Sequence, residues 1–183
     1  QFQDGYSNVR GLTRRLTQVN TQIAIPFLMS SKGYGLLWNN YGLTDFNPAD
    51  ASLKLERGNE MGEAVTVDVT STEGGKREVR RSNAFQGTLD IPTDGKYALL
   101  LDVGQKMARR HHLNIDGKNI MDIRNTWLPP TTSVIVELKA GTHKVSAELE
   151  RNDRPTLYYK AVDDLTTLRS PVASCVDYTL FVG

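Results

Sequence analysis

The stretch FQGTLDIPTDGKYALLLDV, residues 85–103, decides the fold of this chain. Two apolar runs, residues 85–91 and 96–103, flank the segment PTDG, in which Pro92 and Gly95 stand at positions that a tight turn favours. Two such runs separated by a short turn are typical of consecutive β-strands. The segments on either side of this stretch continue the same pattern.

Short strand-like segments follow one another from residue 64 to residue 162. In AVTVDVTST, residues 64–72, valines alternate with polar residues, which places one face of a strand in a core and the other toward water. Further strands are predicted at HHLNI, NIMDI, SVIVEL, HKVSAELE and TLYYKAV, with RNTWLPPTT as a loop. Only residues 10–17 and 104–110 resemble short helices. The chain is therefore predicted to be all-β, an antiparallel sandwich or barrel.

The two ends of the chain have a different character from this middle part. Residues 25–40, IPFLMSSKGYGLLWNN, read as a hairpin, and Pro26 suits an edge strand because it has no backbone N–H. The loop that follows, residues 40–50, is rich in Gly, Asn, Asp and Pro. Residues 170–183 are again strand-like. We expect an insertion carried on strands of a neighbouring sheet.

This interpretation gives three segments. Residues 1–48 are predicted to belong to an incomplete second β-sandwich, residues 49–169 to form the inserted sandwich, and residues 170–183 to return as a strand of the incomplete one. The opening QFQDGYSN has no initiator methionine, which suggests a processed or excised piece. We therefore expect a periplasmic or secreted protein whose export signal was removed.

Composition excludes some classes of function. The 22 Lys and Arg residues nearly balance the 21 Asp and Glu residues, and no concentrated basic face that would bind a phosphate backbone is visible. No apolar run approaches the roughly 20 residues needed to cross a bilayer. We expect a soluble protein without a nucleic acid or a membrane as partner. The single Cys175 cannot form an intramolecular disulfide and says nothing decisive about compartment.

The ends carry a family resemblance. The segments QFQDGYSNVRG, LTQVNTQIAIPFLMSSKGYGLLWNNY and VDYTLFVG resemble, in order, parts of the amino-terminal β-sandwich of glycoside hydrolase family 31, the α-glucosidase and α-xylosidase family. The run at residues 33–40 is the most specific part. The resemblance covers roughly one third of the chain and implies that Gln18 and Asn20 belong to a loop that borders the substrate pocket.

The middle of the chain resembles a different module. GTLDIPTDGKY, IDGK and LKAGTH, at residues 87–97, 115–118 and 138–143, resemble elements of the lectin-like protective-antigen-type (PA-14) domain. Adhesin-type relatives hold calcium with two successive Asp residues, whereas here Asp102 is followed by Val103, so calcium of that kind is not expected. We predict no cofactor and no metal. His111 and His112 are neighbours in a strand and point to opposite faces, so they cannot chelate one ion together.

Catalysis is not expected from the fragment itself. A retaining glycosidase needs two carboxyl groups about 5 Å apart, and in the family that the ends resemble both lie on a (β/α)8 barrel. About 250 residues are typical of such a barrel, which therefore does not fit in this chain. We predict no catalytic residue here, and we expect the catalytic barrel of the parent enzyme to be a partner.

Sugar recognition combines an aromatic ring with planar donors and acceptors for hydroxyl groups. Arg124, Asn125 and Trp127 lie within four positions in the RNTWLPPTT segment, and Arg110 ends a second basic segment, GQKMARR. With Gln18 and Asn20 these four residues are the predicted substrate-binding set. A lone Trp near the end of a strand also fits core or edge packing.

These observations predict a non-catalytic accessory fragment of an α-glycosidase that extends the substrate cleft for oligosaccharides. An independent carbohydrate-binding adhesin is one alternative. A structural spacer or oligomerisation domain is another.

Overall fold

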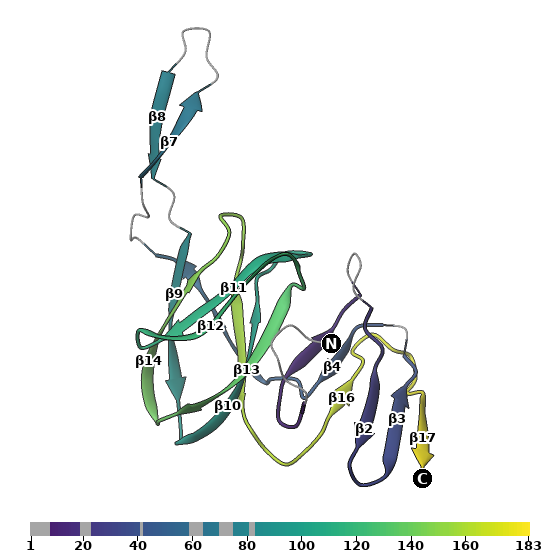
Figure 1. Ribbon diagram of the computed structural model, residues 1–183. Coiled ribbons are helices and arrows are strands. Elements are labelled where there is room, and N and C mark those ends of the chain that lie inside the picture. The colour runs from purple at the N-terminus through teal and green to yellow at the C-terminus, as the bar shows by residue number, and fades with distance from the viewer. Residues whose placement is uncertain (1–7, 19–22, 41, 59–63, 70–74, 81–82) are drawn as a thin grey trace.

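The computed structural model describes residues 8–18, 23–40, 42–58, 64–69, 75–80 and 83–183, with the backbone alone for 64–69 and 75–80. Antiparallel β-strands build this described part of the chain. It contains no helix, and hence none that could cross a membrane. Figure 1 shows a two-sheet body, smaller sheets near both chain ends, and a hairpin that projects away from the body. The all-β, antiparallel prediction is confirmed.

The body is a sandwich of two antiparallel sheets. The four-stranded sheet has the order β13 (Thr131–Leu138), β10 (Gly95–Asp102), β15 (Thr156–Ala161) and β5 (Ala51–Lys54). The five-stranded sheet has the order β12 (Lys118–Leu128), β11 (Ala108–Ile115), β14 (Gly141–Glu148), β9 (Ala84–Ile91) and β6 (Glu56–Arg57). Strands β9 and β10, which follow one another across the PTDG turn, lie in different sheets. They are therefore opposite walls of one core.

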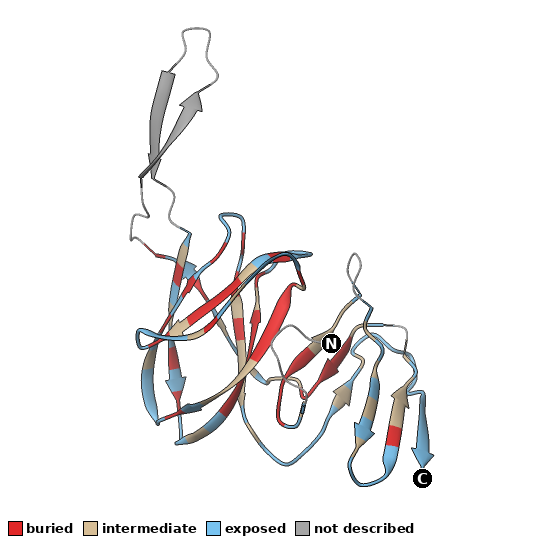
Figure 2. Ribbon diagram, in the orientation of Figure 1, coloured by how far each residue is buried: buried red, intermediate tan, exposed pale blue. Residues whose placement is uncertain are grey.

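The core between the sheets is formed by inward side chains of alternating positions. Leu99 and Leu101 of β10 pack in one cluster with Leu113 of β11 and Val145 of β14, and all four are almost completely buried. Figure 2 shows buried positions on strands of both sheets. This burial is the main source of stability for a sandwich of this size.

Two three-stranded sheets combine the beginning and the end of the chain. One has β4 (Thr44–Phe46) between β1 (Arg14–Leu16) and β16 (Leu168–Arg169). The other has β3 (Tyr34–Trp38) between β2 (Phe27–Ser30) and β17 (Tyr178–Val182). We call them the β4 sheet and the β3 sheet. The three segments predicted at 1–48, 49–169 and 170–183 stay a prediction.

The pairing of the β3 sheet places residues 34–38 beside the last strand of the chain, β17. Tyr34 lies opposite Val182 and Trp38 opposite Tyr178. Strand β2 forms the edge of the sheet, next to Pro26, as the missing N–H of proline requires. Both faces carry exposed apolar side chains, among them Phe27 and Phe181, whose rings meet edge to face at 6.0 Å.

The projecting hairpin consists of β7 (Ala64–Val69) and β8 (Gly75–Arg80), paired from Ala64 with Arg80 to Val69 with Gly75. It is the separate two-stranded element at the top of Figure 1. The strand predicted at residues 64–72 is thus present over 64–69. The orientation predicted for its valine side chains lies outside the described part of the structure.

Both helix predictions are wrong. Residues 10–17 contain β1, residues 104–107 form a bend, and residues 108–110 are the beginning of β11. Each segment contains a glycine in the left-handed region, Gly11 at φ 75° and Gly104 at φ 71°, which a right-handed helix does not accommodate. A Cβ at Gly104 would lie 2.5 Å from the carbonyl oxygen of Arg154, so this position also requires glycine for space.

Two turns at one end of the sandwich are joined by His143. Its Nδ1 lies 2.6 Å from Oδ2 of Asp116 in the β11–β12 turn, and its Nε2 lies 2.8 Å from the carbonyl oxygen of Lys139. Both partners are acceptors, so both contacts are hydrogen bonds only when the ring is protonated and donates from both nitrogens. The Lys139 carbonyl and then the Asp116 carboxylate raise the pKa of His143.

A first prediction concerns the core. Leu99→Ala removes a fully buried side chain from a central strand and leaves a cavity, so we expect the free energy of unfolding to fall by about 2–5 kcal/mol. Urea unfolding measures this change. Leu165→Ala, at a side chain 70% exposed, is the matched control and should change stability by less than about 0.5 kcal/mol.

A second prediction concerns pH. Because the folded-state pKa of His143 is raised above 6.5, its contribution to stability is full below pH 6.5 and is lost as the pH rises through the folded-state value. The difference in unfolding free energy between wild type and His143→Gln should therefore shrink from pH 6 to higher pH. A difference that grows with pH would contradict the imidazolium assignment.

Candidate functional site

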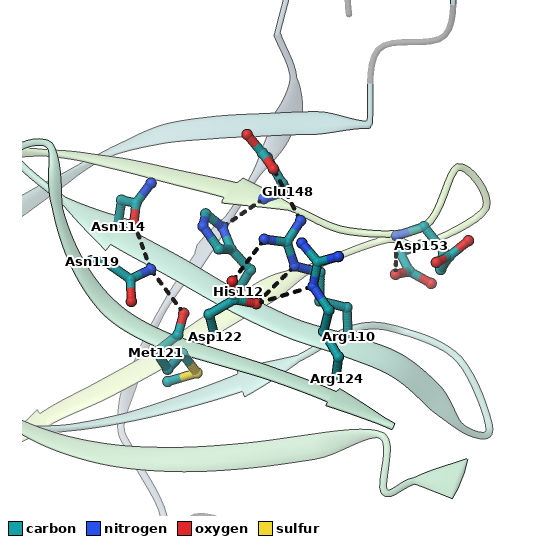
Figure 3. Close-up of polar contacts among 10 residues, drawn as sticks. Arg110, His112, Asn114, Asn119, Met121, Asp122, Arg124, Glu148 and Asp153 are labelled. Carbon is teal, nitrogen blue, oxygen red and sulfur yellow. Dashed lines mark hydrogen bonds and ion pairs between the residues drawn. The ribbon is translucent and has the colours of Figure 1, made fainter. Parts of the chain in front are cut away.

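A polar patch covers the outward face of the five-stranded sheet. Strand β11 points His111, Leu113 and Ile115 into the core, so Arg110, His112 and Asn114 lie on the opposite face. The neighbouring strands add Asp122 and Arg124 from β12 and Glu148 from β14. Figure 3 shows these side chains gathered around Arg110. We call Arg110, His112, Asp122, Arg124 and Glu148 the polar cluster.

Arg110 is the centre of the polar cluster. Its Nε and Nη2 donate to the two carboxylate oxygens of Asp122 at 2.9 and 3.0 Å, and its Nη1 donates to Oε2 of Glu148 at 2.9 Å. The planar fork of a guanidinium fits a carboxylate in this two-bond manner, and the geometry fixes both groups. The bonds from Arg110 hold the pKa of Asp122 below its usual range.

His112 fills a gap between two strands. Strands β11 and β14 pair only at Asn114 with Ser146 and at Ile115 with Val145. Beyond that point the backbone N–H of Glu148 donates to Nδ1 of His112 at 3.0 Å, in place of a backbone carbonyl. The ring proton must then lie on Nε2, so the neutral ring is an N–H donor. Burial lowers the pKa of His112, and the nearby Arg110 charge adds to the shift.

A bulge in β12 carries the aromatic residue of the site. Ala108 pairs with Leu128 and Arg110 with Arg124, so one residue of β11 lies opposite three residues of β12, Asn125 to Trp127. Extra residues of this kind re-aim side chains. The side chain of Trp127 is 55% exposed, and its backbone N–H donates to Oδ1 of Asn125 at 3.2 Å. The predicted loop RNTWLPPTT, residues 124–132, is therefore strand except at Pro129 and Pro130, because β12 extends to Leu128, which pairs with Ala108, and β13 begins at Thr131.

This arrangement fits recognition of hydroxyl groups better than acid–base chemistry. Two guanidinium groups and two carboxylates nearly cancel in charge and offer planar donors and acceptors beside an exposed ring. Asp122 is held ionised, which is the opposite of what a general acid requires. Burial does raise the pKa of Asp153, but its Oδ2 accepts the Glu150 N–H at 2.9 Å within a turn.

The structure separates the predicted substrate-binding residues into two groups. Arg110, Arg124, Asn125 and Trp127 lie together on β11 and β12. Gln18 is exposed and lines a hollow of about 610 Å³ around Trp38. The described walls of this hollow come from residues 16–18, 24, 26, 37–40 and 42–44. Asn20 lies outside the described residues. The role of these residues as substrate ligands stays a prediction.

Sequence reasoning overlooked part of the polar cluster. It considered His112 only as a metal ligand and did not select Asp122 or Glu148. The signal for His112 was present, because period-two alternation in ARRHHLNI places Arg110, His112 and Asn114 on one face. Asp122 and Glu148 could not be found in this way, since their proximity to Arg110 depends on strand pairing and register.

A third prediction tests how the polar cluster is held. Arg110→Lys keeps the charge but cannot bond both oxygens of Asp122 and Glu148 at once, so we expect a loss of about 1–3 kcal/mol in unfolding free energy. Arg124→Lys is the matched control. Arg124 is 68% exposed and its contact to Asp122 is 3.6 Å long, so its loss should be within about 0.5 kcal/mol. Equal losses in urea unfolding would refute this account of the cluster.

Comparisons with known proteins give partial matches. No family model matches the chain. An α-xylosidase of Saccharolobus solfataricus is 51% identical over 45 residues, 25% of this chain and 6% of that protein. An uncharacterized family 31 glucosidase of Pseudescherichia vulneris is 48% identical over 40 residues, 22% of this chain and 8% of that protein.

One solved structure matches the chain over its whole length. The GH31 α-xylosidase from Xanthomonas citri aligns with 100% of this chain and 24% of its own, at a TM-score of 0.61 and 22% identity. This likeness shows the fold. The resemblance of the middle part to protective-antigen-type domains stays a prediction. The chain thus contains a region related to family 31 α-xylosidases and α-glucosidases, within an antiparallel β-sandwich fold.

Proposed function

We propose that this chain is a non-catalytic accessory part of a family 31 α-glycosidase, an α-xylosidase or an α-glucosidase, and that it extends the substrate cleft for oligosaccharides. The partial identity to an α-xylosidase and to a family 31 glucosidase supports the parent enzyme. The observation that carries the role is the β12 bulge, which presents Trp127 to solvent beside the polar cluster.

The chemistry of the site favours a neutral sugar chain. A pyranose ring offers an apolar face for the Trp127 indole and hydroxyl groups for planar hydrogen-bonding partners. Arg110 already pairs with Asp122 and Glu148, so the cluster has little net charge to attract an anion. Arg124 is 68% exposed and extends the row of donors toward the bulge.

Contacts remote from the cleaved bond can serve specificity. Binding energy from distant sugar units can be used to orient the reacting unit in the catalytic site. Under this proposal the catalytic groups lie on the barrel of the parent enzyme, which is the second partner of this chain. The periplasmic or secreted location expected for that enzyme stays a prediction.

A fourth prediction tests the role in the parent glycosidase. Trp127→Ala should raise KM for a long oligosaccharide about 2- to 12-fold, the equivalent of roughly 0.5–1.5 kcal/mol for one ring contact, and leave an aryl glycoside unaffected. Leu165→Ala, another exposed apolar side chain, is the matched control and should change neither value.

Three outcomes separate the alternatives. Equal losses on both substrates would defeat the cleft-extension role. Affinity of the 183-residue chain alone for xyloglucan or starch oligosaccharides, measured by calorimetry and abolished by Trp127→Ala, would favour an independent adhesin-like module. Loss of self-association on deletion of residues 49–169, measured by light scattering, would favour the spacer or oligomerisation role.

A further inference from the structure

The outer face of the four-stranded sheet is covered by the chain's own beginning. Ala98 and Leu100 of β10 are 0% and 3% exposed, yet they point away from the core between the two large sheets. The chain's beginning contacts this sheet at two points. A Cβ added to Gly11 would lie only 2.7 Å from Cγ1 of Val162, the residue after β15. The hydroxyl of Ser133 on β13 donates to the carbonyl oxygen of Thr13. The segment that leads into β1 therefore packs across this face.

Asn47 ties three separate segments together where the chain leaves the β4 sheet. It is 2% exposed and adopts the left-handed region at φ 47°, which asparagine tolerates better than most residues. Its backbone N–H donates to Thr167 O at 2.7 Å, and its Oδ1 accepts from Thr167 N–H at 2.9 Å. Its Nδ2 donates to Leu12 O at 3.1 Å, and its carbonyl accepts from Thr13 Oγ1 at 2.8 Å. All four of its polar groups are thus bonded.

The bonds to Thr167 have a topological consequence. The chain passes from the β4 sheet to the sandwich after Asn47 and returns to β16 after Thr167. Asn47 therefore connects the segment that leaves the β4 sheet to the segment that returns to it at Thr167. It also connects both to residues 12 and 13, which precede β1. Two unconnected crossings would be held only by the packing of the chain's beginning on the sandwich, and the bonds of Asn47 add a second restraint on rotation.

Arg15 bridges the same two bodies with charge. Its Nη1 donates to Oδ2 of Asp102 on β10 at 2.8 Å, and its guanidinium lies 5.1 Å from the ring centroid of Tyr158 on β15. Its Nε also donates to Asp45 of β4 at 3.4 Å. Only 24% of the Arg15 side chain and 7% of the Asp45 side chain are exposed, so solvent screens these pairs less than surface pairs.

We infer that Arg15 and Asn47 form a rigid joint that fixes the orientation of the sandwich relative to the β4 sheet. They are positioning residues, since they contact the two bodies and not a substrate. The use of this orientation rests on the proposed function: it keeps the polar cluster and Trp127 at a set place relative to the parent's catalytic site. A displacement of about 1 Å in a positioned group can cost up to roughly 100-fold in rate.

The joint is tested by a distance measurement that needs no sugar. Spin labels at Gln18→Cys, an exposed position just after β1 of the β4 sheet, and at Lys118→Cys, the exposed first residue of β12, report the separation of the two bodies in the 183-residue chain. Both labels are placed in a Cys175→Ser background. We expect one narrow distance distribution in the wild type. Arg15→Met removes the bridge, and Asn47→Gly removes the side-chain bonds while keeping the backbone conformation accessible. Both should broaden the distribution.

Controls and kinetics separate the joint from the proposed function. Arg10→Ala removes an exposed pair with Asp164 and should leave the distribution narrow. In the parent enzyme the joint variants should raise KM for a long oligosaccharide about tenfold with kcat on an aryl glycoside unchanged, and Arg15→Lys should restore part of the loss. Broadening without any change in KM would support the joint and refute cleft extension. A distribution as narrow as wild type in a folded Arg15→Met variant would overturn the inference.

Discussion

The structure depends on the burial of both faces of strand β10. Four consecutive residues, Ala98–Leu101, are almost completely buried, and successive side chains of a strand point to opposite sides. One side is covered by the five-stranded sheet, and the other by the segment that contains Gly11 and Leu12. A two-sheet sandwich alone would expose Leu100. The union of the sandwich with the chain's beginning is therefore a packing requirement and not an incidental contact.

The sequence predicted the elements of this fold better than their partners. Alternation and turn residues located most of the sandwich strands, and the run ALLLDV was recognised as a strand. Burial on both faces is typical of such an unbroken apolar run, but its second cover, around Leu12, lies more than 80 residues away in sequence and was expected to be helical. The left-handed glycines at residues 11 and 104 could not be identified without backbone angles.

The candidate site shows the same division between local and distant information. Arg124, Asn125 and Trp127 are neighbours in sequence, and they were found from their composition. The bulge that exposes Trp127 depends on the register of β11 against β12, from Ala108 with Leu128 to Arg110 with Arg124, which no single segment encodes. The ion pairs of Arg110 depend on two further strands. A site on a sheet face is therefore only partly readable from one sequence.

Prior pairing within the polar cluster changes what the site can recognise. Because Arg110 is already held by two carboxylates, a ligand does not have to order this side chain, and the entropy cost of binding is reduced. The same pairing leaves little charge for an anionic group, so selectivity must come from shape and hydroxyl geometry. Such selectivity is useful to an enzyme only where the platform stays fixed relative to the bond that is cleaved. Under the proposed function, a preorganised sugar platform and a rigid joint at Arg15 and Asn47 are therefore two parts of one requirement, since either alone would leave the bound sugar chain badly placed.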